Sequence, residues 1–198
     1  MASRSRRRGG FIAAAVLAVG AGGAVLATSA QPGPSPARAL GISAQAAPAG
    51  WPHRELGNGT AVLSYPPTLR PIPGDTGTVS VAMRSSAGAY LLYLNATPRQ
   101  GAETLRNWAA FRVHLLREDD ASSAHLDAAA TGLTFRGGTG SCVIDDYVTR
   151  IGAHHYREIA CLVQGQAAAS VVVGTAPTPR WSQARPLLER AVAAYRIR

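Results

Sequence analysis

Two neighbouring segments, residues 142–149 and 154–163, constrain the fold more than any other part of the sequence. Both are rich in β-branched, aromatic and aliphatic residues, which favour strands. Ile151-Gly152 lie between them, where a two-residue loop would let the second segment fold back on the first. That loop places Cys142 opposite Cys161. The pattern therefore predicts an antiparallel hairpin that brings the two cysteines of the chain together.

The same register predicts three further favourable cross-strand pairs and one unfavourable pair. Opposed apolar, aromatic or oppositely charged side chains stabilise neighbouring strands. The favourable pairs are Ile144 with Ile159, Asp146 with Arg157, and Tyr147 with Tyr156. The unfavourable pair is Asp145 opposite Glu158, because two like charges repel each other unless both are in water or one is paired elsewhere.

The first 30 residues have the pattern of an export signal. Arginines at 4–8 precede an uncharged apolar run at 11–30, which ends in small residues suited to cleavage before Gln31. A retained membrane anchor is the alternative, since about 20 apolar residues can just span a bilayer. We expect an exported protein on the extracellular or envelope side, with membrane contact only through residues 11–30 if the signal is not cleaved.

Export affects the expected chemistry of the two cysteines. Disulfides form and persist in oxidising compartments, and the chain has an even number of cysteines. We therefore predict a disulfide between Cys142 and Cys161. The alternative is a pair of free thiols that serve redox chemistry or bind a metal.

Composition divides the rest of the chain into a linker and one domain. Residues 31–50 are mostly Pro, Ala, Gly and Ser with little periodicity, which indicates a flexible tether. Residues 51–198 have the length of a single domain. The formal net charge is +9, but arginines ahead of the domain supply much of it. The basic residues form no stripe, so we expect no nucleic-acid partner.

Local patterns predict strands and two helices in the order of an antiparallel α+β fold. The first helix is expected to begin at Thr97-Pro98, with Trp108, Arg112 and Leu116 on the face toward the sheet. Residues 123–130 are ambiguous. The other expected elements are strands at 60–64, 78–83, 89–95, 133–135 and 168–174, and a final helix at about 180–195.

No residues form a convincing catalytic set, so we expect neither an enzyme nor a cofactor or metal site. His154 and His155 are adjacent, and on a strand they would point to opposite faces. The run 118–120 (Glu-Asp-Asp) is typical of a solvated helix end, with a metal site as the alternative. The glycine-rich run 136–141 could cradle a phosphate, but it is more typical of a loop or bulge that enters a strand.

The element order and the C-terminal pattern resemble a known family. The pattern consists of Val171-Val172-Val173, Trp181, Pro186-Leu187-Leu188 and the ending 193–197 (Ala-Ala-Tyr-Arg-Ile). It is similar to the PsbP-like fold of actinobacterial exported proteins, including mycobacterial lipoproteins of the LpqN type. The resemblance covers roughly residues 55–198 and implies an antiparallel sheet with helices on both faces. It carries over no site residue, and the lipid-anchoring cysteine of those lipoproteins is absent here.

Three functional hypotheses follow. The resemblance implies an exported, non-enzymatic accessory module that binds an envelope protein or another envelope component. The first alternative is a carrier of a small molecule or lipid in a pocket between sheet and helix, which would require an apolar cavity of about 300 Å³ or more. The second is an extracytoplasmic hydrolase, which would show titratable residues with shifted pKa values in a cleft.

Overall fold

The computed structural model of the chain describes residues 38–119 and 121–198. The predicted export signal at 1–30 lies outside these residues, so the structure does not test it. The described residues belong to one compact unit, which contains both helices and both sheets. No helix within them is long and apolar enough to cross a membrane.

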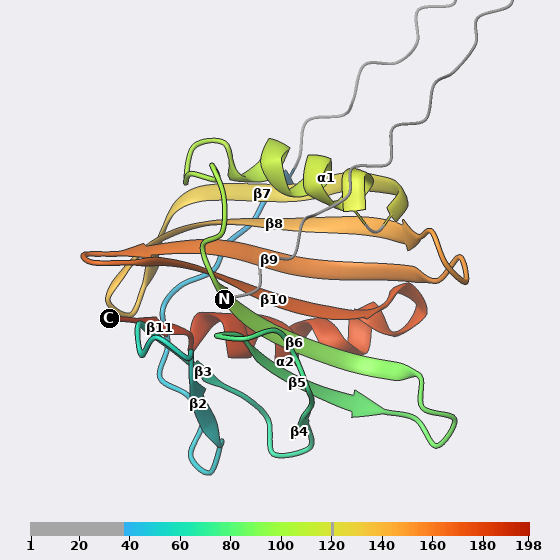
Figure 1. The fold of residues 1–198 in the computed structure, drawn as a ribbon, viewed down its shortest axis with the longest axis horizontal. Coiled ribbons are helices and arrows are strands. Elements are labelled where there is room, and N and C mark those ends of the chain that lie inside the picture. The colour runs from blue at the N-terminus through green and yellow to red at the C-terminus, as the bar shows by residue number, and fades with distance from the viewer. Residues whose placement is uncertain (1–37, 120) are drawn as a thin grey trace, which may run out of the picture. The chain divides into compact units, whose positions relative to one another are not determined.

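Eight strands form the main sheet (Figure 1). They are β1 (Arg38–Ala39), β4 (Arg70–Pro71), β5 (Val79–Arg84), β6 (Tyr90–Pro98), β7 (Ala121–Phe135), β8 (Gly138–Thr149), β9 (His155–Gly165) and β10 (Ala169–Pro177). Their order across the sheet is β1-β7-β8-β9-β10-β6-β5-β4. Every neighbouring pair is antiparallel except β1 with β7, which is parallel. Successive hairpins from β7 to β10 therefore build the centre of the sheet.

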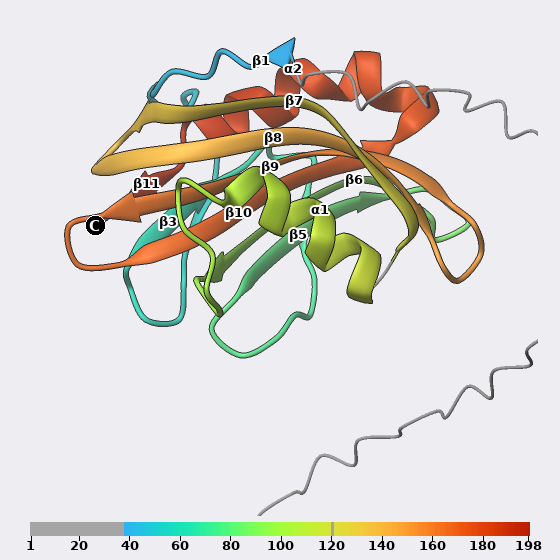
Figure 2. The same cartoon turned by 90° about the horizontal axis from the view of Figure 1, so that it is seen from above.

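Two helices lie on opposite faces of this sheet, as Figure 2 shows. Helix α1 (Trp108–Asp119) packs on β7, β8 and β9, and buries Trp108 and Leu116 as predicted. The short 3₁₀ turn η1 (Thr178–Arg180) leads into α2 (Trp181–Ala193), which packs on the other face. The predicted α+β fold, an antiparallel sheet flanked by helices, is confirmed.

A small second sheet adds to the core on the α2 side. It has the order β11-β3-β2 and consists of β2 (His53–Glu55), β3 (Ala61–Ser64) and β11 (Arg196–Ile197). Leu63 and Ile197 from this sheet join α2 in one buried cluster. Ile197 also donates its backbone N–H to the carbonyl of Arg136, with a nitrogen–oxygen distance of 3.0 Å, which ties the small sheet to the β7–β8 turn. The α2 face is therefore covered by a helix and a small sheet.

The predicted linker at 31–50 is wrong from Arg38 onward. Residues 38–39 form β1 and pair with β7, and the side chains of Leu40 and Ile42 are buried in the main core. Gln45 donates its backbone N–H to the carbonyl of Ala193 at the end of α2. Two apolar side chains at alternating positions are enough to dock this segment, although its composition is that of a tether. The folded unit therefore begins before residue 51.

The predicted start of the first helix at Thr97-Pro98 is also wrong, because β6 continues through Pro98. Arg99 donates its N–H to Ala169 of β10, so the missing N–H of Pro98 would face β5. Strand β5 does not reach this position, because its first residue, Val79, pairs with Ala96. Proline therefore leaves no ladder hydrogen bond unmade. The ambiguous residues 123–130 lie within β7, where three register shifts break the expected alternation.

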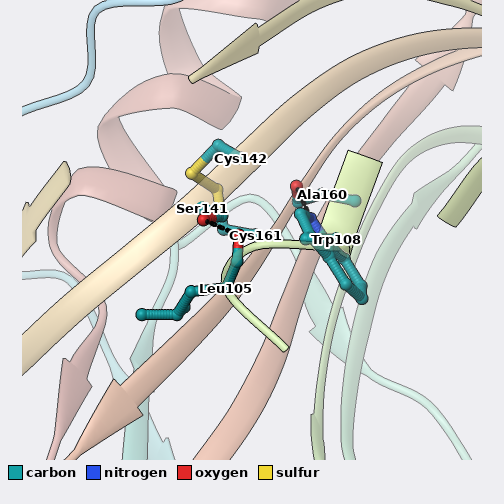
Figure 3. The surroundings of a disulfide bond; sticks show 6 residues. All are labelled: Leu105, Trp108, Ser141, Cys142, Ala160 and Cys161. Atoms are coloured by element: carbon teal, nitrogen blue, oxygen red, sulfur yellow. Dashed lines mark hydrogen bonds between the residues drawn. A yellow bond between two sulfur atoms is a disulfide. The ribbon is translucent and has the colours of Figure 1, made fainter. Parts of the chain in front are cut away.

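The hairpin register is confirmed. Cys142 lies opposite Cys161 and Asp145 opposite Glu158, as predicted, although the connecting turn spans residues 150–153 and not only Ile151-Gly152. The structure contains a disulfide between the two cysteines, with a Cα–Cα distance of 4.0 Å (Figure 3). Both cysteine side chains are buried on the α2 side of the sheet.

Removing this disulfide is expected to destabilise the fold by up to about 3 kcal/mol. The two cysteines are 19 positions apart, and the hairpin already restrains this short loop, so the loop-entropy value is an upper bound. The double variant Cys142→Ala/Cys161→Ala is used because serine at these positions would place unpaired hydroxyl groups in the buried site. Urea unfolding of this variant beside the oxidised wild type measures the loss. Two titratable thiols in the unfolded, unreduced wild type would contradict the disulfide.

Candidate binding groove

The α1 side of the sheet is covered over only part of its width. Helix α1 has 12 residues and packs on β7, β8 and β9, whereas β10, β6 and β5 continue beyond it. A groove of about 830 Å³ opens between α1 and the strands β10 and β6. This volume lies within the range of small-molecule sites, so the groove is the candidate functional site.

The walls and floor of the groove come from different elements. Helix α1 forms one wall, and strands β10 and β6 form the floor. The loop after β6 and the β8–β9 turn close the two ends. Among the lining residues are Phe111, Arg112 and Leu115 from α1, Val171, Val173 and Thr175 from β10, and Tyr93, Asn95 and Thr97 from β6. The site is thus apolar near the helix and polar on β6.

Strict alternation along β6 produces this polar floor. Successive side chains of a strand point to opposite faces of the sheet. Leu92, Leu94 and Ala96 are buried in the core on the α2 side. The alternating residues Tyr93, Asn95 and Thr97 therefore face the groove, and each is only partly buried. Because no helix covers them, polar side chains at these positions keep contact with water at little cost.

A buried ion pair joins α1 to the sheet beside the groove. The side chain of Glu158 on β9 is 1% exposed, and Arg112 donates to its Oε1 from Nε over 2.6 Å. Thr175 donates a longer hydrogen bond, 3.4 Å, to the other carboxylate oxygen. Burial lowers the pKa of Arg112, but the charges of Glu158 and Asp145 outweigh it and raise the pKa overall. The pair therefore holds α1 on the sheet, because separating the two side chains would leave an uncompensated charge in the core.

Asp145 is the unusual member of this cluster. It is fully buried opposite Glu158, and neither of its carboxylate oxygens has a hydrogen-bond partner within the described residues. Burial raises the pKa of Asp145 well above its usual range, and repulsion from Glu158 raises it further. Arg112 balances only one of the two acids. The folded state therefore favours the protonated form of Asp145 more strongly than water does.

Asp145→Asn is expected to raise the free energy of unfolding at about pH 7, and the gain should shrink toward pH 4. The pKa of Asp145 is higher in the folded than in the unfolded state. Between these two values the folded state holds a proton that the unfolded state releases, so rising pH destabilises the wild type. Asparagine does not titrate and can donate to Glu158. Urea unfolding at both pH values measures the effect; an equal gain at both would contradict this interpretation.

Two hydrogen bonds near the disulfide fix the start of α1 on the sheet (Figure 3). Trp108 donates its indole N–H to the carbonyl of Ala160 over 2.9 Å, and Trp108 is only 2% exposed. Ser141 donates its hydroxyl to the carbonyl of Leu105 over 2.5 Å. The disulfide lies on the other side of the same strands, so β8 and β9 are held from both faces. The wall of the groove therefore rests on a rigid part of the sheet.

The sequence-selected polar residues do not meet at one site. His154 is exposed beside the β8–β9 turn, and its ring contacts that of Tyr156. Glu118 is exposed at the end of α1 and pairs with His114, whereas residue 120 lies outside the described chain. Within the described residues, no cluster of three or more His, Cys, Asp or Glu could hold a metal ion. In the glycine-rich run 136–141, Arg136 and Gly137 connect β7 to β8, and the remaining residues are the first part of β8.

Sequence reasoning did not find the groove, although two signals pointed to it. The alternation of polar and apolar residues at 92–97 indicates a strand with one wet face, but it does not say that this face is left uncovered. Arg112 was placed on the helix face toward the sheet, and Asp145 and Glu158 were predicted to oppose each other. Arg112 on an otherwise apolar helix face and the unbalanced acidic pair of Asp145 and Glu158 could together have predicted an ion pair between the helix and the hairpin.

Several solved structures match this chain, among them the following two. CyanoP, the cyanobacterial PsbP of Synechocystis, has a TM-score of 0.54 at 12% sequence identity, over 80% of this chain and 99% of that protein. LpqN of Mycobacterium tuberculosis, described as involved in cell envelope biogenesis, has a TM-score of 0.46 at 14% identity, over 74% of this chain and 89% of that protein. No family model matches the sequence, and no curated protein matches it either.

The chain therefore has a PsbP-like fold, which confirms the architecture that the sequence resemblance implied. At 12% identity the likeness to CyanoP shows the fold alone.

Proposed function

We propose that this chain is an exported, non-enzymatic binding module of the cell envelope, and that it holds a ligand in the groove beside α1. The groove carries the proposal. Its volume of about 830 Å³ exceeds what a small-molecule carrier needs, and Phe111, Leu115 and Val173 give it an apolar side. The buried disulfide and the signal-like pattern at 1–30 support export.

The acidic cluster of Glu158 and Asp145 beside α1 favours binding over catalysis. Glu158 lines the groove, but Arg112 and Thr175 occupy its carboxylate. Asp145 has the strongly raised pKa expected of a catalytic acid, yet it is fully buried and does not line the groove. A general acid must come within hydrogen-bond reach of its substrate. These carboxyl groups therefore serve to position α1.

The groove favours a ligand carrier over a module that binds only another protein. A protein-docking surface is usually broad and fairly flat, with an apolar centre. Here the concave site is open to solvent and mixes apolar side chains with the amide of Asn95 and the hydroxyl of Thr97. A few polar groups in a partly apolar cleft are typical of sites that orient a small molecule.

A matched pair of bulky substitutions tests this function. Thr97 lies in the groove, whereas Thr131 is exposed on β7 and lines neither the groove nor its extension. We expect native mass spectrometry of the full chain, purified from its own envelope, to find a bound small molecule on the wild type and on Thr131→Trp. Thr97→Trp should lose it with an unchanged melting temperature. A ligand-free wild type, or a ligand retained by Thr97→Trp, would overturn the proposal.

A further inference from the structure

The partly exposed tyrosines of the described residues gather in one place. The groove extends over β6 and β5 into a hollow of about 480 Å³, which is lined by Tyr90, Tyr93, Tyr147 and Tyr156. The chain has six tyrosines, and the other two, Tyr65 and Tyr195, are buried in the core on the α2 side. The tyrosines that are not buried in the main core are therefore concentrated at one surface site.

The aromatic rings of the hollow are held in fixed arrangements. Tyr147 and Tyr156 stack across β8 and β9 with ring centroids 5.7 Å apart and an angle of 30° between their planes. Tyr90 and Tyr93 meet edge to face at 5.9 Å. Arg84 covers the ring of Tyr90 and donates to its hydroxyl over 2.5 Å. The hollow thus presents rigid aromatic surfaces, which cost little entropy when a ligand binds.

Hydrogen bonds also fix the polar groups on the floor of the hollow. Asn95 donates its side-chain N–H to the hydroxyl of Ser80 over 2.8 Å and, less closely, to the carbonyl of Val79 over 3.3 Å. The hydroxyl groups of Ser80 and Tyr93 lie 3.3 Å apart. Thr97 and Thr175 add further hydroxyls at the border with the groove. Donors and acceptors are therefore preorganised between aromatic rings.

The hollow is almost free of charge. Asp75 is the only ionisable acid or base among its described lining residues apart from the tyrosines. The domain carries many arginines, but none of them lines the hollow, so nothing there would balance a phosphate or a carboxylate. A single carboxylate suits a ligand that donates hydrogen bonds from neutral hydroxyl groups. Charge therefore favours an uncharged polar ligand.

We propose that the hollow binds a neutral saccharide. A sugar ring has apolar C–H faces that pack on tyrosine rings, and hydroxyl groups that match the amide, hydroxyl and carboxylate groups of Asn95, Ser80 and Asp75. This inference deepens the proposed function and rests on it, because the hollow and the groove share Tyr93, Asn95 and Thr97. The saccharide would be the hydroxyl-rich part of the ligand that the groove holds.

A proline-rich peptide is the main competing occupant, since such peptides also dock on aromatic grooves. Proline rings need aromatic walls but few hydrogen bonds, because proline has no N–H. The hollow instead combines four tyrosines with the polar side chains of Asp75, Thr78, Ser80, Asn95, Thr97 and Thr175. This density of polar groups favours the saccharide.

The test uses the full chain, an array of neutral glycans built from common hexoses, pentoses and N-acetylhexosamines, and a hexaproline peptide. We expect specific glycans to bind, and calorimetry with the best of them to give the affinity. Tyr156→Leu should weaken binding about tenfold, whereas Tyr156→Phe, which keeps the ring, should stay within about threefold. Asn95→Ala should also weaken binding, and Gln166→Ala, an exposed amide outside the hollow, should not.

The outcomes separate this inference from the proposed function. Glycan binding that is lost in Tyr156→Leu and kept in Tyr156→Phe supports the inference. Binding of hexaproline but no glycan, equal effects of the Leu and Phe variants, or a wild type that binds no glycan would overturn it. If the wild type still carries a small molecule that Thr97→Trp loses, the proposed carrier function survives that failure.

Discussion

Arg112→Met is expected to destabilise the fold by about 3–5 kcal/mol, the usual cost of removing one partner from a buried ion pair. The substitution keeps most of the volume of the side chain but leaves Glu158 buried without its cation, next to Asp145. The remaining partner, Thr175, offers only a long hydrogen bond of 3.4 Å. Urea unfolding at neutral pH measures the loss.

An exposed ion pair of the same chain serves as the control. Arg185 and Glu189 pair at 2.8 Å on α2, with side chains 46% and 29% exposed. Arg185→Met should therefore change the free energy of unfolding by less than about 1 kcal/mol. Adding Glu158→Gln to Arg112→Met should recover part of the loss, because it removes the unpaired charge. Similar small losses for both arginine variants would show that the Arg112–Glu158 pair is not buried in solution.

Trp108→Ala should cost about 3–5 kcal/mol, because it opens a cavity under α1 and removes the hydrogen bond to Ala160. Trp108 packs in a buried cluster with Val143, Leu162 and Val171 and stacks on Phe111 at 6.2 Å. Trp108→Phe keeps much of the apolar volume and should lose less, about 1–3 kcal/mol, because it removes the hydrogen bond to Ala160 and part of the buried ring. Thermal or urea unfolding of both variants measures these losses. A loss below about 1 kcal/mol for Trp108→Ala would place this side chain at the surface.

Local sequence rules predicted the hairpin well because its information is local. The Ile151-Gly152 turn and the alternation on both sides fix the register. Once the register is fixed, every cross-strand pair of the hairpin is determined. Gly152 has a φ of 77°, a left-handed conformation that glycine adopts without strain. The disulfide, the Asp146–Arg157 pair and the stacked tyrosines all follow from this single turn.

Sequence rules failed where distant contacts decide the structure. Thr97-Pro98 has the local pattern of a helix start, but pairing with β10 extends β6 through both residues. The helix instead begins at Trp108, after Thr104 and Asn107 have exchanged hydrogen bonds. The docking of residues 38–50 depends on a core that lies far along the chain.

The groove was hidden for a related reason. The sequence indicates only that one face of this strand, with Tyr93, Asn95 and Thr97, contacts solvent. The placement of α1 over β7 to β9 then shows which strands it leaves uncovered. The pairing of Arg112 with Glu158 needs both the helix rotation and the hairpin register. The helix face and the hairpin register were each predicted from the sequence, but the packing of α1 against β9 was not.

A crystal structure of the full chain purified from its own envelope would show directly whether the groove beside α1 holds a ligand. We expect a bound molecule between α1 and the strands β10 and β6, with its apolar part beside Phe111 and Leu115 and its polar part near Tyr93 and Asn95. The Arg112–Glu158 pair should be intact beside it. A structure in which another copy or another protein fills this groove, or in which α1 closes over β10 and β6 and leaves no space, would rule out the proposed carrier function.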